Sequence, residues 1–318
     1  MTLLAVDNLC VGYQTRKGFI AAVEGVSFVL KRGRSLGFVG ESGCGKTTVG
    51  MALMRLLPDN ASIRQGSIIF EGQELLAMPD AQLRQIRWKK IAMIFQAAMN
   101  ALNPIHRVND QIAEAILTHD PLATKASAMQ QVEDLFSLVD IPAERMRDYP
   151  HQYSGGMKQR AVIAMALACH PALIIADEPT TALDVIVQDQ ILSAVKKFQK
   201  QMNISLIFIS HDIAVVADVC DDIGVMYAGQ LVEYGRRDEV FEAPVHPYTK
   251  ALLASYLTLD GAAAQPLPFT GATPNLIAPP PGCRFCDRCP LSDAACSLET
   301  PEYAEITPTH RVLCLRCK

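Results

Sequence analysis

The chain has 318 residues, of which 50% are hydrophobic and 19% are charged, and its formal net charge at pH 7 is −4. This is ordinary globular composition, sufficient for one large domain and a smaller one. Because no broad basic field is present, nucleic acid is not expected as a partner.

No stretch of the sequence predicts entry into a membrane. Residues 1–7 have no basic segment ahead of an apolar one, so a secretory signal is not expected. The longest apolar run, 161–176, is interrupted by His170 and Pro171 and is shorter than the roughly 20 residues of a membrane span. We therefore expect a cytoplasmic chain that reaches a membrane only through a partner.

The N-terminal region predicts two short strands, 3–11 and 22–30, joined by a polar turn at 14–18. They form an antiparallel flank ahead of the next motif. Tyr13 is expected on the exposed turn that ends the first strand, where its ring can stack on a base.

The next motif, Gly40-Glu-Ser-Gly-Cys-Gly-Lys-Thr47, fits the phosphate-loop pattern G-x-x-x-x-G-K-[ST]. A buried strand is predicted at 34–39, and apolar residues recur at helical spacing after the loop, which is the context the motif requires. Lys46 can reach the terminal two phosphates of a nucleoside triphosphate, and the Thr47 hydroxyl can bind Mg²⁺. The predicted nucleotide contacts here are Gly40, Ser42, Gly43, Cys44, Gly45, Lys46, Thr47 and Thr48.

Cys44 lies inside this loop, at the start of the predicted helix. A helix N-terminus can lower the pKa of a thiol. One hypothesis is therefore that oxidation of Cys44 impairs ATP binding, and the other is that Cys44 is a neutral substitution.

Two strands and a helical insert are predicted after the loop. Residues 66–72 and 91–96 read as strands, the second ending on Gln96. Residues 108–147 show helical spacing, with Pro121 and Pro142 as breaks.

A second helix end suited to phosphate follows. Ser154 can cap the next helix, and Gly155 and Gly156 leave its first N–H groups accessible to an anion. Farther along, a buried strand at 172–179 ends in Asp177 and Glu178, the usual place for a carboxylate that orients Mg²⁺ and a second one beside it.

Two more polar residues complete the pattern. Asp184 precedes an amphipathic helix that extends to about Met202, and a last buried strand, 205–212, ends on His211. A histidine that closes a strand in a phosphate-loop sheet is a candidate for contact with phosphate.

In this order the motifs resemble those of the nucleotide-binding subunit of an ABC transporter. The resemblance implies an α/β fold: a P-loop ABC-type ATPase domain with an antiparallel β flank and a helical subdomain, plus a small Cys-rich C-terminal extension. It implies an enzyme that binds ATP with Mg²⁺ and hydrolyses it. The implied domains are 1–260, with the helical subdomain at about 97–165, and the extension at 261–318.

The resemblance also implies roles for individual residues. Tyr13 stacks on adenine, Lys46 and Thr47 hold phosphates and Mg²⁺, and Gln96 senses the metal and contacts the permease. Asp177 orients Mg²⁺, Glu178 polarises the attacking water, and His211 contacts the terminal phosphate. The catalytic residues are thus Glu178, His211 and Gln96, and the Mg²⁺ ligands are Thr47, Gln96 and Asp177.

In this family the Ser154-Gly155-Gly156 helix end caps the nucleotide held by a partner subunit, and Asp184 links the two halves. Two ATP molecules are then sandwiched between two ATPase subunits. Phosphate charge is neutralised only when both halves close, so binding drives closure and hydrolysis releases it.

Four further stretches resemble the dipeptide and oligopeptide importer branch, which also serves nickel in some members: 98–104, 149–152, 226–229 and 246–252. The branch implies a second, different ATPase subunit, two permeases and an extracytoplasmic solute-binding protein. The chain is then peripheral at the cytoplasmic face of the inner (plasma) membrane. The alternatives are an importer ATPase for nickel or another small solute, and a soluble ABC-type ATPase.

The tail is rich in thiols: Cys283, Cys286, Cys289, Cys296, Cys314 and Cys317. Thiolates suit Zn²⁺ or an iron–sulfur cluster, and spacing alone does not separate the two. The resemblance favours a [4Fe–4S] cluster on Cys283, Cys289, Cys296 and Cys314, with Zn²⁺ as the alternative and free thiols as the third possibility. We expect such a group to act as a structural staple.

Overall fold

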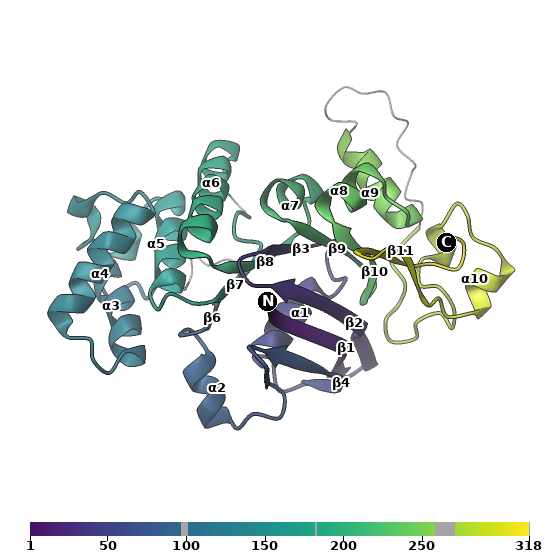
Figure 1. Ribbon diagram of the computed structural model, residues 1–318, viewed down its shortest axis with the longest axis horizontal. Helices are drawn as coiled ribbons and strands as arrows, with labels where there is room; N and C mark the ends of the chain where they lie inside the picture. Colours follow the sequence, from purple (N-terminus) through teal and green to yellow (C-terminus); the bar gives the residue numbers. More distant parts are fainter. Residues whose placement is uncertain (97–100, 182, 258–270, 318) are drawn as a thin grey trace. The chain divides into compact units, whose positions relative to one another are not determined.

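The computed structural model describes residues 1–96, 101–181, 183–257 and 271–317 (Figure 1). The chain divides into two compact units, one made of Met1–Ala77 with Phe208–Lys318 and the other of Met78–Ile207. Within the described ranges, no helix has the length and apolarity needed to cross a membrane.

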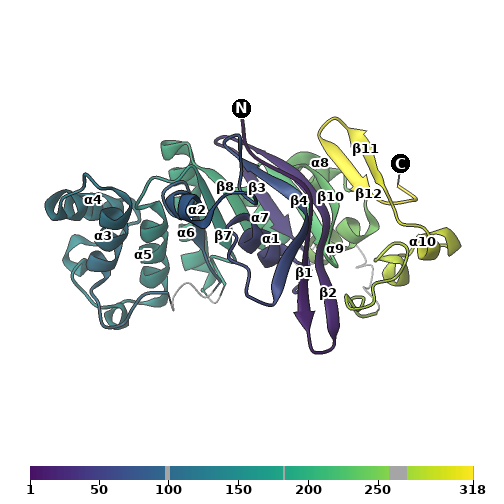
Figure 2. The same cartoon turned by 90° about the horizontal axis from the view of Figure 1, so that it is seen from below.

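The first unit contains an antiparallel sheet in the order β2-β1-β4-β5. Its strands are β1 Thr2–Thr15, β2 Gly18–Lys31, β4 Ala61–Phe70 and β5 Gln73–Glu74. The predicted antiparallel flank is confirmed, and β1 and β2 form the long hairpin visible in Figure 2. The turn predicted at 14–18 is confirmed but is one residue shorter, because Thr15 already pairs with Gly18 and its hydroxyl donates to the Gly18 carbonyl at 2.7 Å.

The same unit contains a second run of strands in the order β11-β12-β10-β9-β3. β3 Ser35–Val39 is buried throughout, as predicted, and pairs in parallel with β9 Asp222–Tyr227. β9 turns through Ala228 and Gly229 into β10 Gln230–Arg236. Helices α1 Lys46–Leu53, α7 Ile213–Val219, α8 Arg237–Glu242 and α9 Pro247–Leu257 belong to this unit.

The tail contributes strands that sequence reasoning did not predict. After the short helices η5 Cys286–Arg288 and α10 Ala294–Leu298, β11 Tyr303–Thr307 and β12 His310–Leu313 form a hairpin. β12 pairs with β10, so the end of the chain extends the sheet of the first unit. The domain boundaries predicted at residues 260/261 and at about residue 97 lie outside the described residues.

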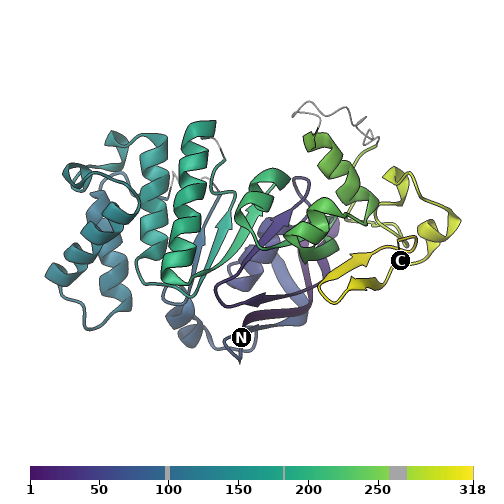
Figure 3. The same ribbon diagram turned by 45° about the horizontal axis from the view of Figure 1, so that its top comes forward.

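The second unit is mainly helical, with α2 Asp80–Ile86, α3 Val108–His119, α4 Lys125–Leu138, α5 Gly155–Leu167 and α6 Val185–Met202. The short turns η2 Ala143–Arg145 and η3 Pro150–Gln152 lie between α4 and α5. α3, α4 and α5 pack together (Figure 3). The predicted helical insert is confirmed, because α3 ends two residues before Pro121 and α4 ends before Pro142.

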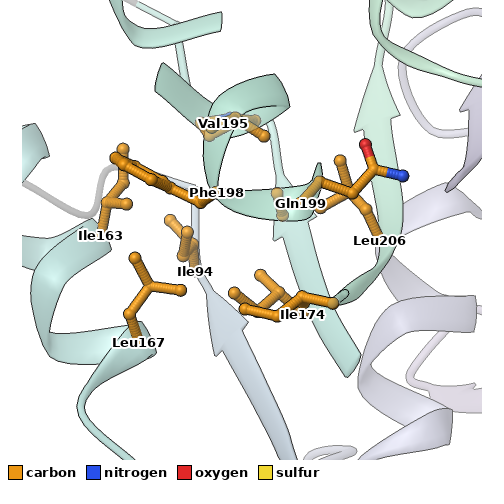
Figure 4. Close-up of a pocket in the computed structure, with 11 residues that line it drawn as sticks. Ile94, Ile163, Leu167, Ile174, Val195, Phe198, Gln199 and Leu206 are labelled. Atoms are coloured by element: carbon orange, nitrogen blue, oxygen red, sulfur yellow. The ribbon is translucent and has the colours of Figure 1, made fainter. Parts of the chain in front are cut away.

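Two parallel strands accompany these helices, β6 Ile91–Ile94 and β7 Leu173–Asp177. β8 Ser205–Ser210 crosses the boundary between the two units. A void of about 30 Å³ lies among apolar side chains of β6, β7, α5 and α6, with Phe198 and Leu167 on its wall (Figure 4). It is about the size of one water molecule, so it is a packing void in the core and not a ligand site.

Candidate active site

The phosphate loop connects β3 to α1, and two of its glycines are required by geometry. Gly40 has φ +154° and a Cβ there would lie 2.0 Å from the Met226 carbonyl oxygen. Gly45 has φ +104° and a Cβ would lie 2.4 Å from the carbonyl oxygen of Ala22. Both contacts are with backbone, so neither position accepts a side chain without moving a strand.

The remaining loop residues divide into buried and exposed groups. Lys46 is buried, and its ammonium group donates to the carbonyls of Gly40 at 2.7 Å and Glu41 at 3.0 Å. Ser42, Gly43 and Thr47 are exposed. The loop therefore presents backbone and a threonine hydroxyl to the outside and keeps the lysine charge directly behind them, an arrangement suited to polyphosphate.

The lowered pKa predicted for the Cys44 thiol is wrong. The side chain is 4% exposed, and burial raises the pKa of its thiol. Lys46, whose Nζ lies 3.6 Å from the sulfur, lowers that pKa but does not overcome burial. A buried thiol is protonated near pH 7 and reacts slowly with oxidants.

Tyr13 lies within β1, opposite Ile20 of β2, and is half-buried, which corrects the predicted position on an exposed turn. Its hydroxyl and that of Thr48 are 3.1 Å apart, so the ring is fixed beside the first turn of α1. Its role in stacking on adenine stays a prediction.

In the second unit, β7 ends on the first of the two predicted acids. Asp177 is 1% exposed, and Glu178 follows with φ +48°, a left-handed conformation that costs a non-glycine residue about 1–2 kcal/mol. The Gln96 amide donates to Glu178 Oε2 at 3.0 Å, and the Thr181 hydroxyl donates to the same oxygen at 2.9 Å. The structure thus joins Gln96 to Glu178, which the sequence places 82 residues apart.

Thr181 is a contact that sequence reasoning missed. The sequence contained one signal for this contact, a threonine hydroxyl three residues after Glu178. The two donors fix the direction of the Glu178 carboxylate.

The glycine-rich helix end has the predicted cap. Ser154 Oγ accepts from the Met157 N–H at 3.3 Å, and Ser154 and Gly155 are exposed. A Cβ on Gly156 would lie 2.8 Å from Cγ1 of Val187, so Gly156 also allows α5 to approach the start of α6. Asp184 caps α6 by accepting from the Val187 N–H at 2.9 Å.

His211 follows β8 directly, as predicted, and the structure shows that it is exposed. The next residue, Asp212, caps α7 by accepting from the Ala214 N–H at 2.9 Å. The backbone around His211 is therefore held by a strand on one side and a capped helix on the other.

The tail thiols belong to the first unit and are all free. The Cys283 N–H donates to the Cys296 carbonyl at 2.8 Å, and burial raises the pKa of Cys283 to about 11. Burial and a hydrogen bond with Cys314 raise the pKa of Cys317 to about 12. The donor chemistry suits Zn²⁺ or iron. In the described ranges, however, no three His, Cys, Asp or Glu side chains are grouped as a metal centre.

Comparison with known families gives two matches in this chain. A model described as ABC transporter matches residues 23–181, and one described as oligopeptide/dipeptide transporter, C-terminal region, matches residues 232–296.

Two curated relatives match over nearly the whole chain. The dipeptide transport ATP-binding protein DppD of Bacillus subtilis is 47% identical over 315 residues, which cover 98% of this chain and 94% of the relative. The oligopeptide transport ATP-binding protein OppD of Escherichia coli is 44% identical over 316 residues, covering 99% and 93%.

Solved structures share the fold. The dimeric post-hydrolysis state of the ATP-binding cassette MJ0796 bound to ADP and Pi has a TM-score of 0.67 at 24% identity, covering 74% of this chain and 98% of that one. The structure of cbiO1 from Clostridium perfringens, part of the ABC transporter complex cbiONQ, has a TM-score of 0.66 at 25% identity, covering 81% and 95%. The predicted α/β ATPase fold is confirmed.

Proposed function

The chain belongs to the ABC transporter family of ATP-binding proteins, and on that premise we propose that it powers the import of dipeptides or oligopeptides by binding and hydrolysing ATP. One observation carries the proposal. Dipeptide and oligopeptide transport ATP-binding proteins match nearly the whole chain, and residues 232–296 match a model described as the C-terminal region of oligopeptide/dipeptide transporters.

The first unit supplies the groups that hold the nucleotide. Lys46 and the N–H groups of the loop hold the phosphates, Thr47 binds Mg²⁺, and Tyr13 stacks on the base. His211, exposed after β8, contacts the terminal phosphate. Together these groups offset phosphate charge with fixed donors.

The second unit supplies the groups for hydrolysis. Asp177 and Gln96 hold Mg²⁺, which offsets charge on the phosphates when it is bound. Glu178 takes the proton of the attacking water, and its carboxylate is directed by the donors of Gln96 and Thr181. Asp177 is buried, and a buried carboxylate needs a cation or donors to offset its charge.

A second ATPase subunit, different from this one, completes the sandwich. Ser154, Gly155 and Gly156 cap the nucleotide of that subunit, and Asp184 contacts it. The start of α6 supports this, because Val185 and Ile186 are 82% and 72% exposed directly after Asp184. Adjacent apolar side chains exposed to this extent suggest a protein contact.

The remaining partners are two permeases and an extracytoplasmic solute-binding protein, with the chain held at the cytoplasmic face of the inner (plasma) membrane by the permeases. Gln96 contacts the permeases. In the tail, Cys283, Cys289, Cys296 and Cys314 would hold a [4Fe–4S] cluster, or Zn²⁺ in its place, as a structural staple.

The experiment is a mild-detergent, anaerobic purification of the tagged chain from native membranes, with its companions identified by mass spectrometry. We expect two permeases, a second ATPase and a binding protein, and that binding protein is then titrated with dipeptides, oligopeptides and Ni²⁺. If the solute-binding protein binds Ni²⁺ and no peptide, the transported solute is nickel and not a peptide. Recovery with soluble partners only would remove the transport role.

A further inference from the structure

The Cys-rich tail touches the phosphate loop directly. Arg288, the last residue of η5, donates from Nη1 to Glu41 Oε2 at 3.0 Å and from Nη2 to Glu41 Oε1 at 2.8 Å. Glu41 is the second residue of the phosphate-loop motif. The Arg288 side chain is 6% exposed and that of Glu41 is 29% exposed, so water screens this bidentate pair only partly.

Glu41 in turn shapes the loop through its backbone. Its carbonyl accepts from Lys46 Nζ at 3.0 Å and from the Cys44 N–H at 3.2 Å. Its N–H donates to the Tyr248 hydroxyl at 3.0 Å. A displacement of Glu41 therefore moves the carbonyl that receives the phosphate-binding lysine.

Arg288 is held in place by the packing of its own segment and by a hydrogen bond to a tyrosine. We name residues 283–289 the brace segment. Phe285 within it is 2% exposed and its ring packs at 5.1 Å from Tyr227 and 5.5 Å from Tyr248. Arg288 Nη1 also donates to the Tyr227 hydroxyl at 3.2 Å.

A second set of contacts connects the brace segment to the phosphate loop. Arg284 donates to the Ala228 carbonyl at the tip of the β9–β10 hairpin and pairs with Glu24. The next residue of that tip, Gly229, donates its N–H to the Cys44 carbonyl at 3.0 Å. Two arginines of the segment thus contact groups that form or adjoin the phosphate loop.

We propose that Arg288 is a positioning residue for ATP binding, which fixes the Glu41 carboxylate and offsets its charge so that the phosphate loop accepts a polyphosphate. The inference rests on the proposed function in one respect, that ATP binds at this loop. Without Arg288, a carboxylate with no bidentate partner would lie in the loop that receives the phosphates, and it would repel them. When the charges of Arg288 and Glu41 are both removed, that repulsion is absent.

The test uses the full-length chain and a fluorescent ATP analogue, mant-ATP, titrated in the presence of Mg²⁺. We expect Arg288→Ala to weaken binding about tenfold and Glu41→Gln about twofold. The double variant should bind within about twofold of Glu41→Gln, because no carboxylate is left to offset. Arg288→Lys keeps the charge but not the bidentate geometry and should lose about threefold.

Arg316→Ala is the matched control. Arg316 pairs with Asp293 and lies between Cys314 and Cys317 in the same tail, and its removal should leave the affinity for mant-ATP unchanged. Melting temperatures are measured for every variant. If Arg288→Ala does not fold, the comparison of Glu41→Gln, Arg288→Lys and their combination tests the same coupling.

Three results would overturn the proposal: unchanged affinity in Arg288→Ala, losses that multiply in the double variant, or an equal loss in Arg316→Ala. Each of these requires a wild-type chain that binds mant-ATP and a Lys46→Ala chain that does not. If the wild-type chain itself fails to bind mant-ATP, the assignment of ATP to this loop is overturned, and the proposed role of Arg288 is overturned with it.

Discussion

The side-chain amide of Gln96 donates to the carboxylate of Glu178 at 3.0 Å, and Glu178 holds this contact from a left-handed backbone conformation with φ +48°. Such a conformation persists only where the surroundings fix it, and it is typical of functional sites. The amide, the Thr181 hydroxyl and the strained backbone all determine where this one carboxylate lies. That is the property expected of a group that must meet a water molecule in one position.

The first prediction concerns this carboxylate. Glu178→Gln in the assembled transporter should retain ATP but lower its turnover by at least about a hundredfold, because the amide cannot accept the proton of water. Thr181→Ala removes one donor to the same oxygen and should lower turnover only about two- to fivefold. Radiolabelled phosphate release and ATP retention on filters measure the two quantities. Undiminished turnover in Glu178→Gln would remove Glu178 from its role.

The second prediction separates backbone strain from collision in the phosphate loop. Gly43 and Gly45 both have positive φ, but a Cβ on Gly43 meets nothing within 4 Å, whereas one on Gly45 lies 2.4 Å from the Ala22 carbonyl oxygen. Gly43→Ala should therefore lower the free energy of unfolding by about 1 kcal/mol and Gly45→Ala by about 3 kcal/mol or more. Urea unfolding measures both. Equal losses would show that φ alone sets the cost.

Local patterns predicted the parts of the site that depend on near neighbours in the chain. The phosphate loop between strand and helix, the cap at Ser154 and the acids at the end of β7 each follow from a few consecutive residues. Their structural positions are confirmed, whereas their roles toward ATP stay predictions.

Contacts between distant residues were not predictable in this way. Arg288 and Glu41 are 247 residues apart, and no periodicity links them. The pKa of Cys44 depends on burial by surrounding elements, so its place at a helix start gave the wrong direction. The β11–β12 hairpin was missed because its short strands show no regular alternation of buried and exposed residues, and β12 is fixed by pairing with β10.

The third prediction concerns His246, whose pKa burial lowers to about 4, with Glu233 raising it and Lys250 lowering it further. Its Nδ1 accepts from the Tyr248 N–H at 3.0 Å, so the folded chain holds the ring neutral. In the unfolded chain the pKa is about 6.5. The stability that this difference contributes is present above about pH 6.5 and is lost as pH falls toward about 4, up to about 3 kcal/mol.

His246→Asn tests this, since the Asn oxygen can still accept from Tyr248 but does not titrate. Between about pH 7 and pH 5, the free energy of unfolding should fall less steeply in His246→Asn than in the wild type. His106→Asn, at an exposed position, should leave the slope unchanged. Identical slopes in all three chains would contradict a buried neutral His246.

The fourth prediction concerns the metal or cluster that we propose for the tail. Chains purified anaerobically should contain about four iron atoms each, or about one zinc atom in the alternative. Replacement of Cys283, Cys289, Cys296 or Cys314 by Ser should lower this content and the melting temperature, whereas Cys286→Ser and Cys317→Ser should not. Elemental analysis of the six variants decides between iron, zinc and free thiols. If the wild-type protein contains no metal, the proposed metal site is wrong, and the tail is held by its hairpin and its arginine contacts alone.

The fifth prediction concerns Gly156, which has two separable reasons to lack a side chain. A methyl group there would collide with Val187 at 2.8 Å, and it would also lie in the first turn of α5, next to the exposed residues Ser154 and Gly155. Gly156→Ala should lower the free energy of unfolding by about 1–2 kcal/mol, and adding Val187→Ala should recover most of that loss by removing the colliding methyl.

ATP turnover should not recover with stability. If the start of α5 closes on the nucleotide of a partner subunit, the methyl group added by Gly156→Ala still keeps phosphate from the N–H groups, and turnover of the double variant stays at least about tenfold below wild type. Val187→Ala alone is the control and should keep nearly full turnover. Full recovery in the double variant would mean that Gly156 serves only the packing of α5 on α6, and the helix end at Ser154 would lose its part in closing the sandwich.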